Sequence, residues 1–202
     1  MNEKPAVTSV PINDLLARRW SPRSFATDRP VSREHLLALL EAARWAPSCF
    51  GAEPWRYLIW ERDSSPELWQ QAYGCLGKSN QKWVKNAPVL LLSLTDRLFA
   101  HDGTVNRWSE HDTGAASMSL CVQAVALGLM VHQMGGFDAL KARALFAIPE
   151  QFTPMAMIAV GYQADAALLD DDLRTRELAP RKRRALGQTF FAGRWASPFS
   201  GD

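Results

Sequence analysis

The sequence predicts an α+β protein in which helices pack around a central sheet. Segments with helical and strand-like patterns mix along the whole chain of 202 residues. The sequence contains no internal repeat, low-complexity tract or linker. A chain of this length fits one large domain, residues 1–202, which can bury a core without disulfides or a structural metal.

Capping and spacing signals predict the helices. The first spans residues 13–19 and ends there because Pro22 disfavours helical backbone at Ser21. The second begins after Ser32, a preferred N-cap residue, carries leucines at helical spacing on one face, and stops at Pro47. Three further helices are predicted over residues 65–76, 109–128 and 138–146.

Apolar and β-branched runs predict the strands over residues 55–61, 89–95, 129–133 and 155–162. The runs at 89–95 and 155–162 are continuously apolar, which is typical of strands covered on both faces. Residues 77–86 are predicted to form a polar loop with a helical turn around Trp83. The tail from Asp165 is mostly polar and becomes aromatic again near its end.

Composition excludes several classes of protein. Apolar residues make up 47% and charged residues 22%, which is ordinary for a globular chain. A net charge of +2 does not by itself indicate a nucleic-acid or membrane partner. The three cysteines are widely spaced and the start of the chain lacks an apolar leader, so we expect a reducing cytoplasm and neither disulfides nor a metal site. Eight tryptophans suit a deep core, a large interface or a planar ligand.

One uncharged stretch needs a separate interpretation. Residues 113–137 contain no Asp, Glu, Lys or Arg and are long enough to cross a bilayer. The stretch also holds polar side chains and glycines, and no Lys/Arg cluster flanks it. We therefore expect a core helix that runs into a buried strand.

Four segments could carry chemistry. RRWSPRSF (18–25) places guanidiniums and hydroxyls beside a chain bend, which suits phosphate binding. PSCFGAEPW (47–55) is an irregular loop of small residues that lets a ligand approach the backbone. MGGFD (134–138) exposes backbone donors at a strand-to-helix turn. RKRR (181–184) could complete a phosphate pocket, contact nucleic acid or simply be solvated.

Other motifs are missing or weak. The sequence has no G-x-G-x-x-G after a strand, no P-loop and no G-x-S-x-G, so a phosphate would have to be held by side chains. The His-Asp pairs at residues 101–102 and 111–112 are similar to the His-Asp (HD) pair of metal-dependent phosphohydrolases. That class is all-helical, and the strand-like runs at 89–95 and 155–162 argue against it. His35 and His132 have no ligand-spaced partner and are interpreted as structural.

Taken together and in order, these segments resemble the FMN-dependent nitroreductase family. The similarity extends from Arg18 to about Trp195. It implies an α+β fold with a mainly antiparallel central sheet, an intertwined homodimer and two FMN sites at the subunit interface. The helix from Ser109 would then pack against the partner, and the aromatic tail would embrace it.

The resemblance implies a set of FMN-binding residues. Arg19, Ser21, Arg181 and Arg183 would hold the phosphate, with backbone contact from Trp20, and Arg23 would lie near the flavin N1/O2 edge. Asn80 would face the pyrimidine edge, the Gly135 N–H would point at N5, and Gly136 would keep that approach open. The ring would be lined by Pro47, Ser48, Cys49 and Gly51.

The implied activity is ping-pong oxidation of NADH or NADPH, with hydride transfer through flavin N5 to a nitroaromatic, quinone or related small-molecule acceptor. No side-chain acid or base is required, so no catalytic residue is assigned. Gly51 and Glu53 stand where the family commonly has Asn and Gln. Two alternatives remain: a flavin-binding protein without reductase turnover, such as a sensor or flavin-handling enzyme, and a nucleic-acid-binding module using residues 181–184.

Overall fold

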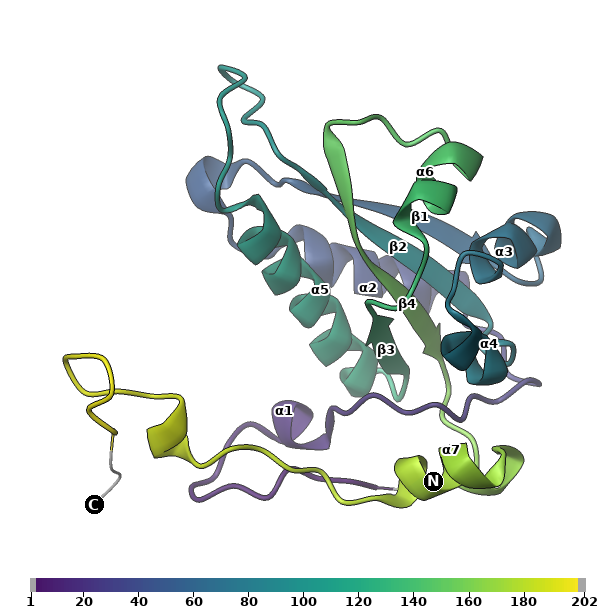
Figure 1. Cartoon of the computed structure of the whole chain (residues 1–202). Coiled ribbons are helices and arrows are strands. Elements are labelled where there is room, and N and C mark those ends of the chain that lie inside the picture. The colour runs from purple at the N-terminus through teal and green to yellow at the C-terminus, as the bar shows by residue number, and fades with distance from the viewer. Residues whose placement is uncertain (1–2, 200–202) are drawn as a thin grey trace.

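The computed structural model describes residues 3–199, which form one four-stranded sheet with helices on both faces (Figure 1). The strands lie in the order β1-β2-β4-β3 and every neighbouring pair is antiparallel. The strands are β1 (Trp55–Glu61), β2 (Val89–Asp96), β3 (Met130–Met134) and β4 (Phe152–Gly161). The α-helices are α1 (Asp14–Arg18), α2 (Arg33–Arg44), α3 (Pro66–Tyr73), α4 (Lys78–Val84), α5 (Ser109–Ala126), α6 (Ala139–Leu145) and α7 (Asp171–Leu178).

The central strand β2 divides the core into two layers. Leu90, Leu92 and Leu94 face a cluster with side chains from α3, α4 and α6, while Leu91 faces a cluster with α2 and α5. Successive side chains of a strand point to opposite faces, so a strand buried on both sides must be apolar throughout. The continuous run at 89–95 is thereby explained, and the predicted α+β fold with a central antiparallel sheet is confirmed.

The uncharged stretch is a helix followed by a strand, as expected. Helix α5 packs Ala116, Leu120 and Ala124 into the core, and Gly128 turns the chain at a φ of +70° into β3. Positive φ is costly for residues with a Cβ, which is why glycine suits this turn. Across residues 3–199, no helix has both the length and the apolar character that a membrane crossing demands.

Three local predictions were wrong. Residues 77–86 are not mainly loop, because α4 forms there and buries Trp83 and Val84. Helix α3 ends at Tyr73, three residues earlier than the predicted end at residue 76. The polar tail contains α7, which the sequence analysis did not predict.

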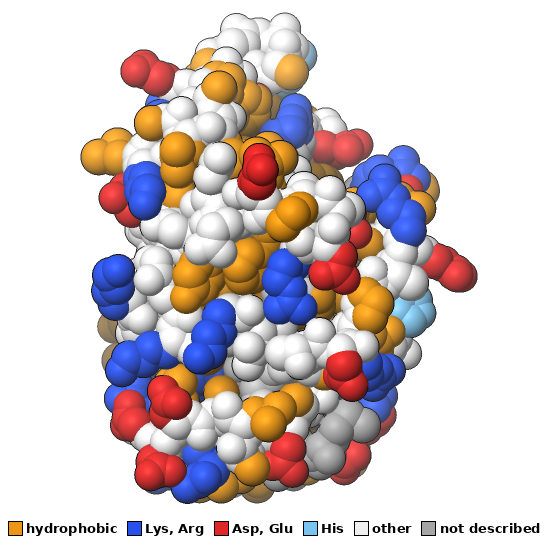
Figure 2. Space-filling model, turned by 90° about the vertical axis from the view of Figure 1, so that its right-hand side faces the viewer, with side chains coloured by type: hydrophobic (Ala, Val, Ile, Leu, Met, Phe, Trp, Pro, Cys, Tyr) orange, Lys and Arg blue, Asp and Glu red, His pale blue; other side chains and the backbone are white. Residues whose placement is uncertain are grey.

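The C-terminal segment after α7 runs beside the N-terminal segment and then extends away from the sheet (Figure 1). It ends in an extended arm, residues 186–199, in which the Trp195 side chain is 86% exposed. Elsewhere, the face in Figure 2 intersperses cations with acidic side chains, in keeping with the small net charge.

Candidate functional site

The segment that follows α1 presents side chains to two opposite sides. Arg19 and Ser21 are half-buried, and an Arg19 Nη1–H donates to the Ser21 Oγ at 3.3 Å. Trp20 is buried beneath the Lys4 ammonium, which lies 4.5 Å from its ring centre. Because successive side chains point to opposite sides, the Arg19 guanidinium and the Ser21 hydroxyl lie side by side. Together they are a pair of hydrogen-bond donors suited to an anion.

Arg181 brings the C-terminal basic run to this segment. Its Nη1 donates to the carbonyl oxygens of Lys4 at 2.7 Å and Ala17 at 2.8 Å. Burial lowers the pKa of Arg181, and the positive charges of Arg19 and Arg183 lower it further. The Arg181 guanidinium, from the C-terminal segment, therefore lies near enough to Arg19 and to Arg183 for their charges to act on it.

Among the residues that the structure describes, no acidic side chain pairs with this cation cluster of Arg19, Arg181 and Arg183. Within residues 3–199, none of the three guanidiniums lies within 4.0 Å of a carboxylate. Like charges gathered without a counter-charge destabilise the protein unless an anion joins them. The donor set fits a phosphate: planar guanidiniums for bidentate contacts and the Ser21 hydroxyl.

Strand β3 lies next to this cluster. His132 Nδ1 lies 2.9 Å from the Pro22 carbonyl oxygen, to which it donates as the neutral tautomer. Burial, and then the charges of Arg23 and Arg19, lower the pKa of His132 to about 4. The histidine is therefore neutral at physiological pH. Because the charges of Arg19 and Arg23 act on His132, both arginines lie near β3.

The paired glycines follow β3 and leave the backbone open. The Gly136 carbonyl accepts hydrogen bonds from the Gly77 N–H at 2.9 Å and the Asn80 side-chain amide at 3.1 Å. A Cβ on Gly135 would meet nothing within 4 Å, whereas one on Gly136 would lie 3.0 Å from the Asn80 amide nitrogen. The Gly135 backbone is thus accessible and the carbonyl that follows it is fixed.

The open turn and Arg19 of the cation cluster both adjoin the edge strand β3. His132 and Gly135 are separated by about 10 Å at the rise of an extended chain. Side chains and backbone donors on this edge could therefore bind the two ends of one elongated molecule that carries a phosphate.

The loop at residues 47–53 lies elsewhere. The Cys49 N–H donates to Asp112 Oδ2 at 2.9 Å, which ties the loop to the first turn of α5. Arg19 of the cation cluster lies further along α5, near Cys121, where its charge opposes the rise in pKa that burial gives the Cys121 thiol. Asp112 and Cys121 are about 14 Å apart along the helix. Within one chain, Pro47, Ser48, Cys49 and Gly51 are therefore not brought to the cluster.

The same loop has an unusual backbone. Phe50, Gly51 and Glu53 have φ values of 53°, 64° and 45°. Such values suit glycine at position 51 and cost energy at the other two, and strain of this kind gathers at functional sites. Phe50 is 85% exposed and packs edge-on against Phe99.

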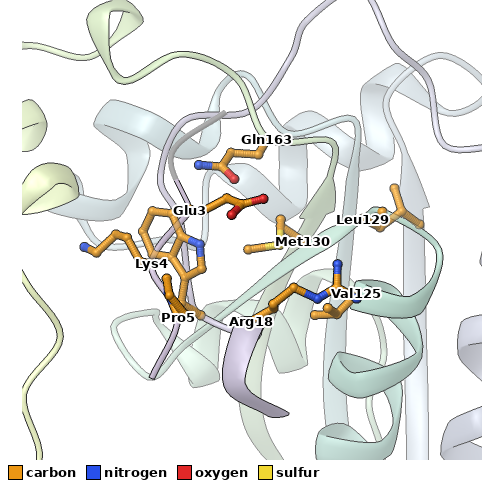
Figure 3. Close-up of a pocket in the computed structure, with 10 residues that line it drawn as sticks. Glu3, Lys4, Pro5, Arg18, Val125, Leu129, Met130 and Gln163 are labelled. Atoms are coloured by element: carbon orange, nitrogen blue, oxygen red, sulfur yellow. The ribbon is translucent and has the colours of Figure 1, made fainter. Parts of the chain in front are cut away.

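A separate cavity of about 150 Å³ lies between the N-terminal segment and the end of α5 (Figure 3). Lys4 and Pro5 line one side and Val125 and Leu129 the other. Arg18 and Trp20 contribute to it, but Arg19 does not. Over residues 3–199, no group of three or more His, Cys, Asp or Glu side chains could hold a metal ion.

Sequence reasoning missed Glu177 of α7. Its carboxylate is buried and accepts hydrogen bonds from the backbone N–H groups of Arg23 and Ser24. A glutamate in a helix of low hydropathy carries no sequence signal for such a position.

The antiparallel sheet, the cation cluster and the open glycine turn together define a class of α+β protein suited to a phosphate-bearing ligand. The sequence profile of the Nitroreductase family matches residues 16–162, and the chain belongs to that family.

Two similar proteins and one similar solved structure agree with this membership. A solved structure described as an oxidoreductase containing FMN is 36% identical, with a TM-score of 0.90 over 98% of this chain and 99% of that one. An uncharacterised 15.4 kDa protein of Mycolicibacterium smegmatis is 35% identical over 67% of this chain and 90% of its own length. YodC of Bacillus subtilis, provisionally named an NAD(P)H nitroreductase, is 26% identical over 73% of this chain and 87% of its own.

Proposed function

We propose that this protein is an FMN-dependent oxidoreductase that oxidises NADH or NADPH and reduces a nitroaromatic, quinone or related acceptor by a ping-pong reaction. The observation that carries the proposal is the cluster of Arg19, Arg181 and Arg183, which pairs with no carboxylate of residues 3–199. The open Gly135 turn at the end of β3 accompanies it. The similarity to an oxidoreductase containing FMN points the same way.

Each residue of the candidate site has a defined task in the proposal. Arg19, Ser21, Arg181 and Arg183 bind the phosphate, and Trp20 contributes its backbone. Arg23 supplies positive charge toward the ring, where it favours the reduced anionic flavin. The Gly135 N–H donates toward the flavin, and Asn80, whose side-chain amide donates to the Gly136 carbonyl, faces the pyrimidine edge.

FMN, when bound, supplies the chemistry by accepting and donating a hydride at N5. The chain contributes position and charge, and no side chain is required to move a proton. The lowered pKa keeps His132 neutral, so it adds no charge beside Arg19 and Arg23.

We further propose that the protein is a homodimer in which the 47–51 loop of one subunit completes the site of the other. Support comes from the separation of this loop from the cation cluster along α5. Large apolar side chains also remain exposed: Trp45 at 78%, Phe50 at 85% and Trp195 at 86%. Large aromatic side chains are enriched at subunit interfaces, so a second subunit would cover such residues.

Anaerobic stopped-flow spectroscopy tests the activity. The purified protein should carry yellow flavin whose visible absorption is lost with NADH or NADPH and regained with a nitroaromatic or quinone. Flavin that binds but is never reduced would instead make this a flavin-binding protein without turnover. A colourless protein that cannot take up FMN would overturn the proposal entirely.

Light scattering coupled to size exclusion tests the assembly. The expected mass is twice that of the 22.6 kDa chain. A monomer that binds FMN with full affinity would show that the 47–51 loop of a second subunit is not needed.

A further inference from the structure

Glu177 holds a carboxylate in an unusual place for a charged group. The residue is 1% exposed, and it belongs to α7, beyond the residues that the family profile matches. A buried carboxylate is strongly destabilising unless hydrogen bonds or an opposite charge compensate for lost hydration. The groups that bind the Glu177 carboxylate therefore indicate the role of its charge.

Those partners are backbone groups next to the cation cluster. The Arg23 N–H lies 2.9 Å and 3.0 Å from the two carboxylate oxygens, and the Ser24 N–H lies 3.2 Å from one of them. The Arg23 guanidinium lies 3.8 Å from the same carboxylate. One side chain thus restrains two consecutive peptide units and one arginine.

The opposite side of the same bend is also held. His132 donates to the carbonyl of Pro22 at 2.9 Å, and the Ser24 hydroxyl donates to the Asp165 carbonyl at 2.6 Å. Residues 22–24 are consequently fixed by contacts from β3, from α7 and from the segment before α7. The direction in which Ser21 and Arg23 leave the backbone is set before any ligand arrives.

We propose that Glu177 is a positioning residue, which presets the bend at 21–24 for phosphate binding and restrains the Arg23 guanidinium. Preorganised donors lose less freedom on binding, so the benefit should appear in affinity for the phosphate group. This inference rests on the proposed function, because it takes FMN as the ligand.

The test compares FMN with riboflavin, which lacks the phosphate, on apoprotein titrated by flavin fluorescence. Glu177→Gln keeps the size of the side chain and removes its charge. We expect it to reduce the preference for FMN over riboflavin by about tenfold, as expected for a weakened charge-assisted hydrogen bond. The potential of bound FMN should become more positive, because Arg23 loses its counter-charge.

Asp172→Asn is the matched control, since Asp172 lies on the same helix, is exposed and pairs with Arg176. It should leave both affinities and the potential unchanged. If Glu177→Gln lowers only the melting temperature, with the FMN preference and the potential unaltered, Glu177 is merely structural and the inference fails.

Glu177→Asp provides a second variant should Glu177→Gln not fold. It keeps the charge but withdraws it by one methylene, so a smaller loss of FMN preference is expected, and an unchanged preference would again contradict the inference. Failure of the wild-type protein to bind FMN would instead overturn the proposed function itself, so the two failures can be distinguished.

Discussion

The side-chain amide of Asn80 donates a hydrogen bond to the carbonyl oxygen of Gly136, 56 residues further along the chain, at 3.1 Å. The Gly77 N–H donates to the same oxygen at 2.9 Å. Together these bonds join the start of α4 to the turn after β3. The turn therefore keeps its shape through contacts with α4, not through its own sequence alone.

Adding a methyl group at Gly136 should disturb this contact. In Gly136→Ala the new Cβ would lie 3.0 Å from the Asn80 amide nitrogen, so Asn80 must shift and the hydrogen bond weakens. We expect a loss of about 1 kcal/mol in the free energy of unfolding, measured by urea denaturation of the apoprotein.

Gly135→Ala is the matched comparison, because its Cβ would meet nothing within 4 Å. It should leave apoprotein stability unchanged and weaken FMN binding. Equal destabilisation by both variants would argue against the role given to Asn80.

The cation cluster predicts that anions stabilise the apoprotein. Inorganic phosphate should raise the melting temperature of the wild-type protein, because it relieves repulsion among Arg19, Arg181 and Arg183. In Arg183→Gln the repulsion is already reduced, so we expect no loss of melting temperature without phosphate and a smaller rise with it.

Differential scanning calorimetry over a phosphate series, at constant ionic strength maintained with chloride, measures both quantities. Arg194→Gln, in the exposed C-terminal arm, controls for a general effect of net charge. A phosphate response as large in Arg183→Gln as in the wild type would place Arg183 outside the anion site.

His132 should make stability depend on pH. Its pKa is about 4 when folded and 6.5 when unperturbed, so between these values the unfolded chain takes up a proton that the folded chain does not. Stability therefore falls as the pH is lowered from 6.5 to 4, by up to about 3 kcal/mol from this group.

Urea denaturation at pH 7 and pH 4.5 measures this effect. In His132→Asn the fall in stability between the two pH values should be smaller than in the wild type, although the variant is less stable at pH 7. The exposed His111→Asn should show the wild-type fall. A fall of the same size in all three proteins would contradict the assignment.

Asp112 should determine the position of the 47–53 loop. Its Oδ2 accepts the Cys49 N–H at 2.9 Å, and its Oδ1 lies 3.1 Å from His111 Nδ1. Asp112→Ala leaves the Cys49 amide without an acceptor, at a cost of about 1–3 kcal/mol in unfolding free energy. Faster hydrogen exchange confined to this loop is the expected signature.

Glu110→Gln, at an exposed position two residues before Asp112 in α5, is the control and should not alter exchange. If the loop completes the site of a second subunit, Asp112→Ala should also weaken FMN binding while leaving the cation cluster intact. Unchanged exchange in Asp112→Ala would show that other contacts hold the loop.

Local patterns predicted most elements because their cause is local. The aromatic and β-branched residues of β1, the continuous apolar run of β2 and the Ser32 cap of α2 each leave a signature within a few residues. Helix α4 lacks such a signature, since only Trp83 and Val84 are buried and its first residues are polar.

The candidate site was predictable only in part. The resemblance identified the arginines and the paired glycines, and the structure brings Arg19, Arg181 and Arg183 together and leaves Gly135 accessible. It does not bring Pro47, Ser48, Cys49 and Gly51 to them within one chain. Their assignment to the flavin therefore stays a prediction that depends on the second subunit.

The amino-acid sequence by itself determined the order and kind of most helices and strands, because periodicity, caps and prolines act between near neighbours. Only the tertiary structure decided that Arg181 would bind the carbonyl of Ala17 and that Glu177 would meet the amides of Arg23 and Ser24. Those contacts join residues more than 150 positions apart. They depend on the path of the whole chain around the sheet, which no local pattern records.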